Sequence, residues 1–180
     1  MRKLIYAINM SLDGCVDHTK FLPDEDTFAY FTQLVQDTGT FLYGRKTYQL
    51  MVPYWPDAAK EDPSDEFAQA FDAVEKIVVF SRSLNSAEDE KTRIVHTGIR
   101  EEVLKLKQQP GKNIFTGGVN LAAQLAALGL IDEYHFVVVP IVVGEGRRLF
   151  EGINLQEKLQ LKLVDSTVFK SGAVVLKYVK

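Results

Sequence analysis

Residues 112–150 read KNIFTGGVNLAAQLAALGLIDEYHFVVVPIVVGEGRRLF, and this stretch decides the fold. Asn113 to Thr116 is a short apolar run that suits a buried strand. The pair Gly117-Gly118 follows it and leads into residues 119–128, where leucines recur at helical spacing among alanines. A glycine ends that helix, and Tyr134 to Val139 is then rich in β-branched and aromatic residues, as a central strand is. The stretch therefore predicts one βαβ unit with glycines where the strand becomes a helix.

The Gly117-Gly118 turn has two interpretations. Two adjacent glycines let a ligand approach the backbone, and the helix that follows offers unpaired N–H groups at its positive end, which favours an anion such as phosphate. The alternative is that the glycines only permit a tight turn with close packing of helix on strand. A lone glycine pair does not decide between them, so the other strand ends carry the rest of the evidence.

The composition indicates one globular domain spanning residues 1–180. The chain is 46% hydrophobic and 25% charged, with a net charge of −3. It has no apolar run long enough to span a membrane and shows no signal peptide, so we expect a cytoplasmic protein. A single cysteine, Cys15, fits a reducing compartment. The mild acidity argues against a nucleic-acid partner, and the three histidines lack metal-ligand spacing, so we expect no metal.

The N-terminal strand is predicted over Lys3 to Asn9, an apolar run that suits a buried position. It leads to Ser11-Leu12-Asp13-Gly14, a polar turn. Asp and Gly together often mark a turn with no further role. The alternative is that this loop lines a cleft, because ligands of open α/β sheets bind at the carboxyl ends of strands.

Two further strands end in groups suited to an anion. Phe41 to Tyr43 runs into Gly44-Arg45-Lys46-Thr47, which opens a helix with two cations and a hydroxyl. Lys76 to Phe80 ends in Ser81-Arg82-Ser83, where the Arg82 guanidinium is suited to a phosphate. Taken singly, each stretch is explained equally well by a solvated helix start or a polar turn.

Two other segments complete the pattern. Residues 52–64 carry three prolines and the pair Tyr54-Trp55. We expect a loop there whose rings cover a pocket and stack on a planar ligand, or else plug the edge of the core or a subunit interface. At the C-terminus, Gln160 to Phe169 and Ala173 to Val179 alternate apolar and polar residues about a Lys-Ser-Gly turn, which predicts an antiparallel hairpin.

In this order and spacing the motifs resemble those of the dihydrofolate reductase-like superfamily. Within it, they most resemble the reductase domain at the C-terminus of bifunctional riboflavin biosynthesis proteins and its small stand-alone relatives. The motifs are Ser11-Leu12-Asp13-Gly14, Gly44-Arg45-Lys46-Thr47, Ser81-Arg82, Thr116-Gly117-Gly118, Ile131-Asp132-Glu133, and Pro140 with Gly144-x-Gly146. The resemblance covers nearly the whole chain. It implies an α/β fold of three layers (αβα) with a mixed, mainly parallel sheet of about eight strands and a C-terminal antiparallel hairpin.

The resemblance also implies NADPH as the cofactor. Gly44 to Thr47 would hold the pyrophosphate, Ser81 and Arg82 would face the adenosine 2′-phosphate, and Gly117-Gly118 would lie beneath the pyrophosphate or the nicotinamide ribose. By the same resemblance, we expect the Gly117-Gly118 bond to be cis. The full set of implied cofactor-binding residues is Gly44, Arg45, Lys46, Thr47, Ser81, Arg82, Ser83, Thr116, Gly117, Gly118, Val119 and Asn120.

The implied substrate is a small pyrimidine- or pteridine-like molecule. The implied substrate-binding residues are Asn9, Ser11, Asp13, Tyr54 and Trp55, with Asp13 as the catalytic candidate through a polar contact or a proton relay. The cations of the 144–148 loop, Arg147 and Arg148, would meet a substrate phosphate or stay solvated.

The first helix departs from the dihydrofolate reductase pattern. Those enzymes carry a carboxylate four residues before a substrate-contacting Phe. If Phe31 is that residue, this chain has Thr27 at the matching position, and Asp26 lies about 100° away around the helix. Dihydrofolate itself is therefore a poor match as the substrate.

We therefore predict an NADPH-dependent oxidoreductase similar to 5-amino-6-(5-phosphoribosylamino)uracil reductase or dihydrofolate reductase. Two alternatives remain: an NADP(H)-binding module without turnover, and a dimeric structural protein in which the Tyr54-Trp55 segment is an interface. The resemblance implies a homodimer.

Overall fold

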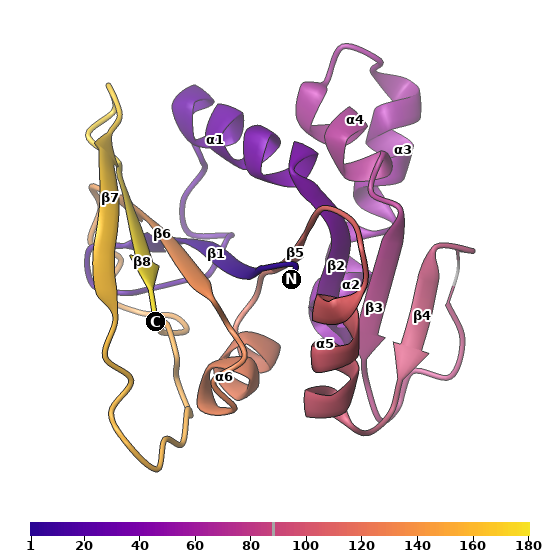
Figure 1. Ribbon diagram of the computed structural model, residues 1–180. Helices are drawn as coiled ribbons and strands as arrows, with labels where there is room; N and C mark the ends of the chain where they lie inside the picture. The colour runs from indigo at the N-terminus through magenta and orange to yellow at the C-terminus, as the bar shows by residue number, and fades with distance from the viewer. Residues whose placement is uncertain (88) are drawn as a thin grey trace.

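The computed structural model describes residues 1–87 and 89–180, in which a twisted eight-stranded sheet has helices on both faces (Figure 1). The strands are β1 (Leu4–Ser11), β2 (Thr38–Gly44), β3 (Lys76–Phe80), β4 (Thr92–Val95), β5 (Asn113–Thr116), β6 (Glu133–Val139), β7 (Lys162–Val168) and β8 (Val174–Val179). The helices are α1 (Glu25–Gln36), α2 (Arg45–Met51), α3 (Tyr54–Glu61), α4 (Glu66–Asp72), α5 (Ile99–Gln108) and α6 (Asn120–Ala127).

The strand order is β4-β3-β2-β5-β1-β6-β8-β7. The strands from β4 to β6 in this order pair in parallel, whereas β8 is antiparallel to β6 and β7 is antiparallel to β8. The predicted fold class is therefore confirmed, including the C-terminal antiparallel hairpin.

The central strands are apolar on both faces because both faces of the sheet are covered. Successive residues of β2 enter opposite cores, as the two-residue period of a strand requires. Phe41 packs with residues of α1 and α4, and Leu42 packs with residues of α5 and α6. This two-sided burial explains the consecutive apolar residues Phe41–Tyr43 in β2 and Ile77–Phe80 in β3.

Residues 52–64 differ from the prediction of a loop, because they contain helix α3. Pro53 takes the N-cap position and Pro56 lies in the first turn, where a helix has no backbone hydrogen bond for proline to remove. The side chain of Trp55 packs on Phe67 of α4, with ring centroids 4.5 Å apart.

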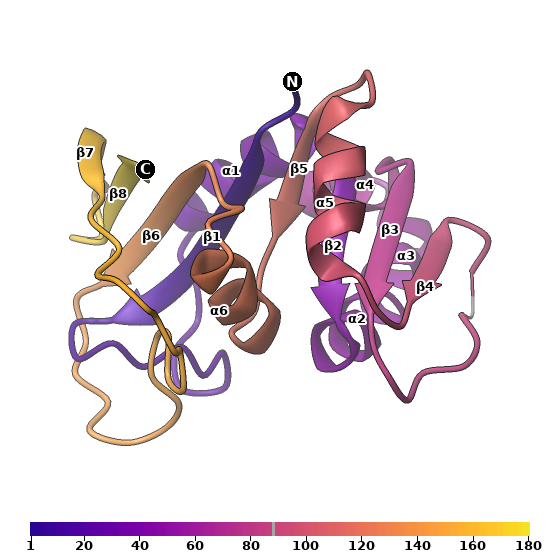
Figure 2. The same ribbon diagram turned by 60° about the horizontal axis from the view of Figure 1, so that its bottom comes forward.

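The parallel strands all point their carboxyl ends to one edge of the sheet (Figure 2). Strand β5 pairs with β1 only from Leu4 to Tyr6, although β1 continues to Ser11. The sheet therefore opens between these two strands at its carboxyl edge, where ligands bind in open α/β sheets.

Among the described residues, none of the helices combines the length and apolar character needed to cross a bilayer.

Candidate functional site

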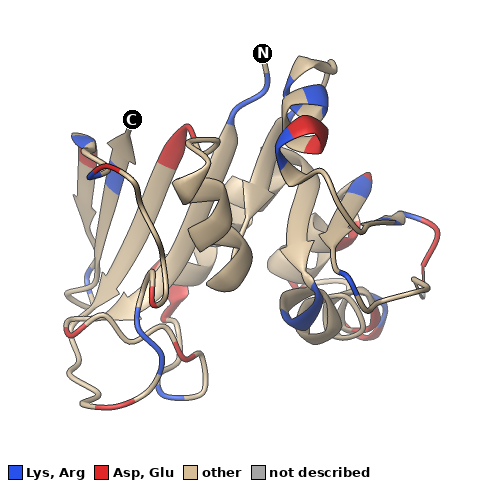
Figure 3. Ribbon diagram, turned by 90° about the horizontal axis from the view of Figure 1, so that it is seen from below, with Lys and Arg blue, Asp and Glu red and all other residues tan. Residues whose placement is uncertain are grey.

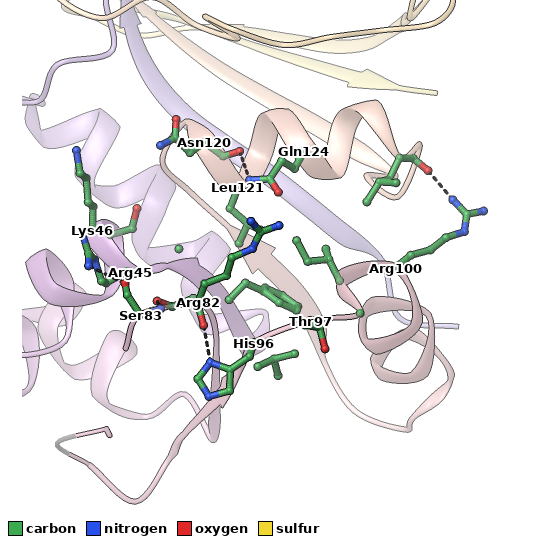
Figure 4. A pocket seen from close by; sticks show the side chains of 18 of the residues that line it. Arg45, Lys46, Arg82, Ser83, His96, Thr97, Arg100, Asn120, Leu121 and Gln124 are labelled. Carbon is green, nitrogen blue, oxygen red and sulfur yellow. Dashed lines mark hydrogen bonds between the residues drawn. The ribbon is translucent and has the colours of Figure 1, made fainter. Parts of the chain in front are cut away.

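A cavity of about 840 Å³ opens at the carboxyl edge, between the ends of β2, β3 and β4 and the starts of α5 and α6 (Figure 4). Its volume falls in the range of small-molecule sites, roughly 300–1,000 Å³. It is lined by residues 44–47, 80–83, 95–101 and 119–121, together with Gln124, Leu128 and Arg147.

The cavity is basic although the chain is acidic. Five cations and one acid, Glu101, line it, giving a net charge of +4, whereas the whole chain carries −3. The cations are Arg45, Lys46, Arg82, Arg100 and Arg147. Figure 3, which views the molecule from below, shows Lys and Arg segments near the carboxyl ends of the strands. Such concentration of one sign in a concave site attracts ligands of the opposite charge.

The helices that begin at the cavity lack side-chain caps. The N-caps of α2, α5 and α6 are Gly44, Gly98 and Val119, none of which makes a side-chain capping hydrogen bond. By contrast, α1 and α4, whose N-caps do not line the cavity, are capped by Asp24 and Asp65. The first N–H groups around the cavity therefore lack a protein carboxylate and are available to a ligand.

The cations differ in how far they are already engaged. Arg45 donates through Nη1 to Ser83 Oγ at 2.7 Å, which connects the start of α2 to the end of β3. His96 donates through Nδ1 to the Ser81 carbonyl at 2.8 Å, which connects β4 to β3. Arg82 has no hydrogen bond or ion pair with any described residue, and its side chain extends across the cavity toward α6 (Figure 4). Arg82 is thus free to pair with an anion of a ligand.

The Gly117-Gly118 turn lies beside the cavity and contacts both β1 and α2. Tyr6 donates its hydroxyl to the Gly118 carbonyl at 2.9 Å. Gly118 has φ +77°, and a Cβ added to it would lie 2.5 Å from Thr47 Oγ1. No peptide bond among the described residues is cis, so the prediction of a cis bond here is wrong. The left-handed conformation of Gly118 makes the turn without the cost of a cis bond.

Most of the predicted cofactor-binding residues line this cavity. They are Gly44, Arg45, Lys46, Thr47, Ser81, Arg82, Ser83, Val119 and Asn120. Gly117 and Gly118 lie in the adjoining turn, and Thr116 is buried with its hydroxyl donating to the Leu42 carbonyl at 2.9 Å. Thr116 thus joins β5 to β2 rather than facing the cavity, and the binding roles of the others stay predictions.

The predicted substrate residues lie elsewhere. Asn9, Ser11 and Asp13 are at the end of β1, and Asn9 Oδ1 is buried with no hydrogen-bond partner among the described residues. Tyr54 and Trp55 lie on α3 at one end of a row of rings that continues through Phe67 to Phe28. The outer rings, Tyr54 and Phe28, are exposed. None of these residues lines the cavity.

Asp13 connects the loop after β1 to the 143–148 loop. Its carboxylate pairs with Arg148 at 2.7 Å and accepts from Ser11 Oγ at 2.6 Å. It also accepts from the backbone N–H groups of Val143 and Gly144, at 3.1 and 2.9 Å. These hydrogen bonds, that of Arg148 first, hold the pKa of Asp13 well below its usual range. A carboxyl that stays ionised is a poor proton donor, so this geometry does not support the predicted proton relay.

Replacing Asp13 with asparagine is expected to destabilise the protein at neutral pH. Because folding lowers the pKa of Asp13, the carboxylate contributes stability above its unfolded pKa, about 3.9, and loses it as the pH falls further. The gap in melting temperature between wild type and Asp13→Asn should therefore be present at pH 7 and shrink below about pH 4. Thermal unfolding followed by circular dichroism at several pH values measures it, and a gap that is constant with pH would contradict the ion pair.

No sequence motif indicated the cavity wall formed by residues 95–101. Nothing in His96-Thr97-Gly98 distinguishes it from an ordinary turn, apart from a glycine between a strand and a helix.

For Arg147 the prediction is that it meets a substrate phosphate or stays solvated. The structure places it at the cavity, where it donates to Asn120 Oδ1 and lies 3.6 Å from the Glu151 carboxylate.

Comparison with known proteins gives consistent matches over the whole chain. The family model of the RibD C-terminal domain matches residues 2–175. The uncharacterized protein YyaP of Bacillus subtilis (strain 168) is 34% identical over 98% of this chain and 94% of its own length. The uncharacterized protein YwjB of the same organism is 29% identical over 99% of this chain and 98% of its own.

Three solved structures share the fold. A putative riboflavin biosynthesis protein from Shewanella sp. PV-4 has a TM-score of 0.74 at 19% identity, covering 98% of both chains. A diaminohydroxyphosphoribosylaminopyrimidine deaminase/5-amino-6-(5-phosphoribosylamino)uracil reductase from Thermotoga maritima has a TM-score of 0.68 at 15% identity, covering 99% of this chain and 56% of its own. Dihydrofolate reductase from Enterococcus faecalis, complexed with NADP(H) and RAB-propyl, has a TM-score of 0.63 at 15% identity, covering 98% of this chain and 95% of its own. The predicted superfamily fold is thereby confirmed.

Proposed function

We propose that this chain, which belongs to the family of the RibD C-terminal domain, is an NADPH-dependent reductase acting on a small pyrimidine- or pteridine-like substrate. The observation that carries the proposal is the basic cavity, with its net charge of +4 and uncapped helix starts at the carboxyl edge of the sheet.

The residues around the cavity fit the charged half of NADPH. Arg82, Arg45 and the Ser83 hydroxyl would hold the adenosine 2′-phosphate, because a guanidinium matches a phosphate in geometry and charge. The N–H groups that begin α6, after the Gly117-Gly118 turn, would hold the pyrophosphate. When bound, NADPH supplies the hydride, while the protein positions the reactants and supplies the electrostatics.

The surroundings of α1 favour a substrate other than dihydrofolate. Asp26 accepts from the backbone N–H of Lys170 at 3.2 Å, so its carboxylate faces the β7–β8 turn. Thr27, at the position where dihydrofolate reductases carry a carboxylate, offers no charge for a protonated pterin ring. The exposed rings of Tyr54 and Phe28 offer flat apolar surfaces for a planar substrate.

Wild-type protein is expected to bind NADPH at least about tenfold more tightly than NADH, because only NADPH carries the 2′-phosphate. Titration of each nucleotide, followed by its fluorescence, measures the difference. Equal and very weak responses would contradict the proposal. Absorbance of NADPH is then followed with panels of pyrimidine and pteridine compounds. Tight binding with no oxidation in any panel would favour the alternative of a binding module without turnover.

The homodimer, the single domain and the cytoplasmic location stay predictions. Every residue of the edge strand β7 is exposed, so its outer backbone groups are open to pairing with a second copy of the chain.

A further inference from the structure

Tyr6 is a buried residue of β1 whose hydroxyl reaches the cavity turn. Its side chain is fully buried, and its ring makes edge contacts with Tyr134 and Phe136 at centroid distances of 6.4 and 6.1 Å. These contacts fix the ring, and burial raises the pKa of the hydroxyl, so the proton stays in place. The hydroxyl donates to the Gly118 carbonyl at 2.9 Å, a contact between residues 112 positions apart in the sequence.

This hydrogen bond determines the direction of the next N–H group. In a trans peptide the carbonyl and the N–H that follows point in opposite directions. The bond between Gly118 and Val119 is trans, and its carbonyl is held toward Tyr6 in the core. The N–H of Val119 must therefore point away from the core, on the side where Val119 lines the cavity. It has no hydrogen-bond partner among the described residues.

We propose that Tyr6 is a positioning residue: its hydroxyl holds the Gly118–Val119 peptide so that the Val119 N–H faces an anionic group of the ligand. In identifying that group as a phosphate of NADPH, the inference rests on the proposed function. The role is specific to the hydroxyl, because the ring alone would fill the same space in the core. Thr47, whose hydroxyl would lie 2.5 Å from a Cβ added to Gly118, limits any compensating movement of the turn.

Tyr134 provides a matched control. It is fully buried, belongs to the same core cluster, and its hydroxyl has no hydrogen-bond partner among the described residues. Tyr134→Phe therefore removes a hydroxyl from the same surroundings without removing a hydrogen bond, a change expected to be neutral or stabilising. Tyr6→Phe, by contrast, removes the hydroxyl whose hydrogen bond to the Gly118 carbonyl holds the turn.

The first measurement requires no ligand. In nuclear magnetic resonance spectra of ¹⁵N-labelled protein, Tyr6→Phe should shift or broaden the amide signals of Gly118 and Val119, whereas Tyr134→Phe should leave them in place. Unchanged signals in Tyr6→Phe would overturn the positioning role.

The second measurement is NADPH affinity. Tyr6→Phe should weaken binding about fivefold, the usual effect of one lost hydrogen bond, while Tyr134→Phe stays within about twofold of wild type. Equal affinities in the two variants would overturn the inference. Equal losses of NADPH affinity that track the drop in each variant's melting temperature would overturn it as well. If wild-type protein does not bind NADPH, the proposed function fails, and the amide signals alone decide the role of Tyr6.

Discussion

Gly118→Ala is expected to weaken NADPH binding by about 100-fold, because a displaced turn loses backbone hydrogen bonds to a charged phosphate, which contribute about 1.5–3 kcal/mol each. It should also lower the free energy of unfolding by about 3 kcal/mol, in part from left-handed backbone and in part from overpacking. Gly118 has φ +77°, a backbone conformation that residues with a side chain rarely adopt. The new methyl group would also lie 2.5 Å from Thr47 Oγ1. The turn and the start of α2 cannot both keep their positions.

Gly117→Ala is the matched control for this prediction. A Cβ at Gly117 would meet nothing closer than the Phe115 ring at 3.7 Å, an ordinary contact, and the residue does not have a positive φ. The free energy of unfolding of Gly117→Ala should stay within about 0.5 kcal/mol of wild type, since neither strain nor overlap with the protein arises. Nucleotide fluorescence titration measures the affinity of Gly118→Ala and chemical unfolding measures the stability of both variants. Equal losses of stability in the two variants would contradict the assigned role of Gly118.

A second substitution separates the two causes. Thr47→Ala removes the hydroxyl that overlaps the new methyl group but leaves the backbone strain. The double variant Gly118→Ala/Thr47→Ala should therefore recover part of the lost stability, with about 1–2 kcal/mol of backbone strain left. No recovery would mean that backbone conformation alone accounts for the glycine.

The elements of the sheet could be predicted from the sequence because each carries a local pattern. Strands β3 and β5 are apolar runs buried on both faces, and the predicted limits of Lys76–Phe80 and Asn113–Thr116 match those in the structure. Prolines within residues 52–64 predict a loop and so conceal helix α3, although Pro53 and Pro56 lie at its N-terminus, where a helix tolerates them.

The contacts that define the candidate site could not be predicted, because they join residues far apart in the chain. Asp13 is polar and follows a strand, which suggested a cleft residue, but its partner Arg148 lies 135 positions away. Nothing local to Asp13 indicates that ion pair. Tyr6 and Gly118 lie 112 positions apart, and a tyrosine in an apolar strand predicts only burial. Local motifs thus indicated which turns lie at the cavity, and the topology determines which side chains hold those turns in place.

Arg82→Glu is expected to weaken NADPH binding by about 100-fold while changing NADH binding only a few-fold, because charged hydrogen bonds contribute about 1.5–3 kcal/mol each and the reversal adds repulsion. Arg82 lies in a cavity with one acid and has no hydrogen bond or ion pair with a described residue, so its loss removes no internal interaction. The melting temperature should therefore stay close to that of wild type.

Lys105→Glu is the control for the change in net charge. Lys105 is exposed on α5 and does not line the cavity, so the same reversal there should affect both nucleotides weakly and equally. The selective loss in Arg82→Glu should shrink as salt is added, because ions screen charges at an open site within about 8 Å at physiological ionic strength. If Arg82→Glu weakens NADPH and NADH alike, Arg82 acts on a part shared by the two nucleotides, and the 2′-phosphate must be assigned to other cations of the cavity.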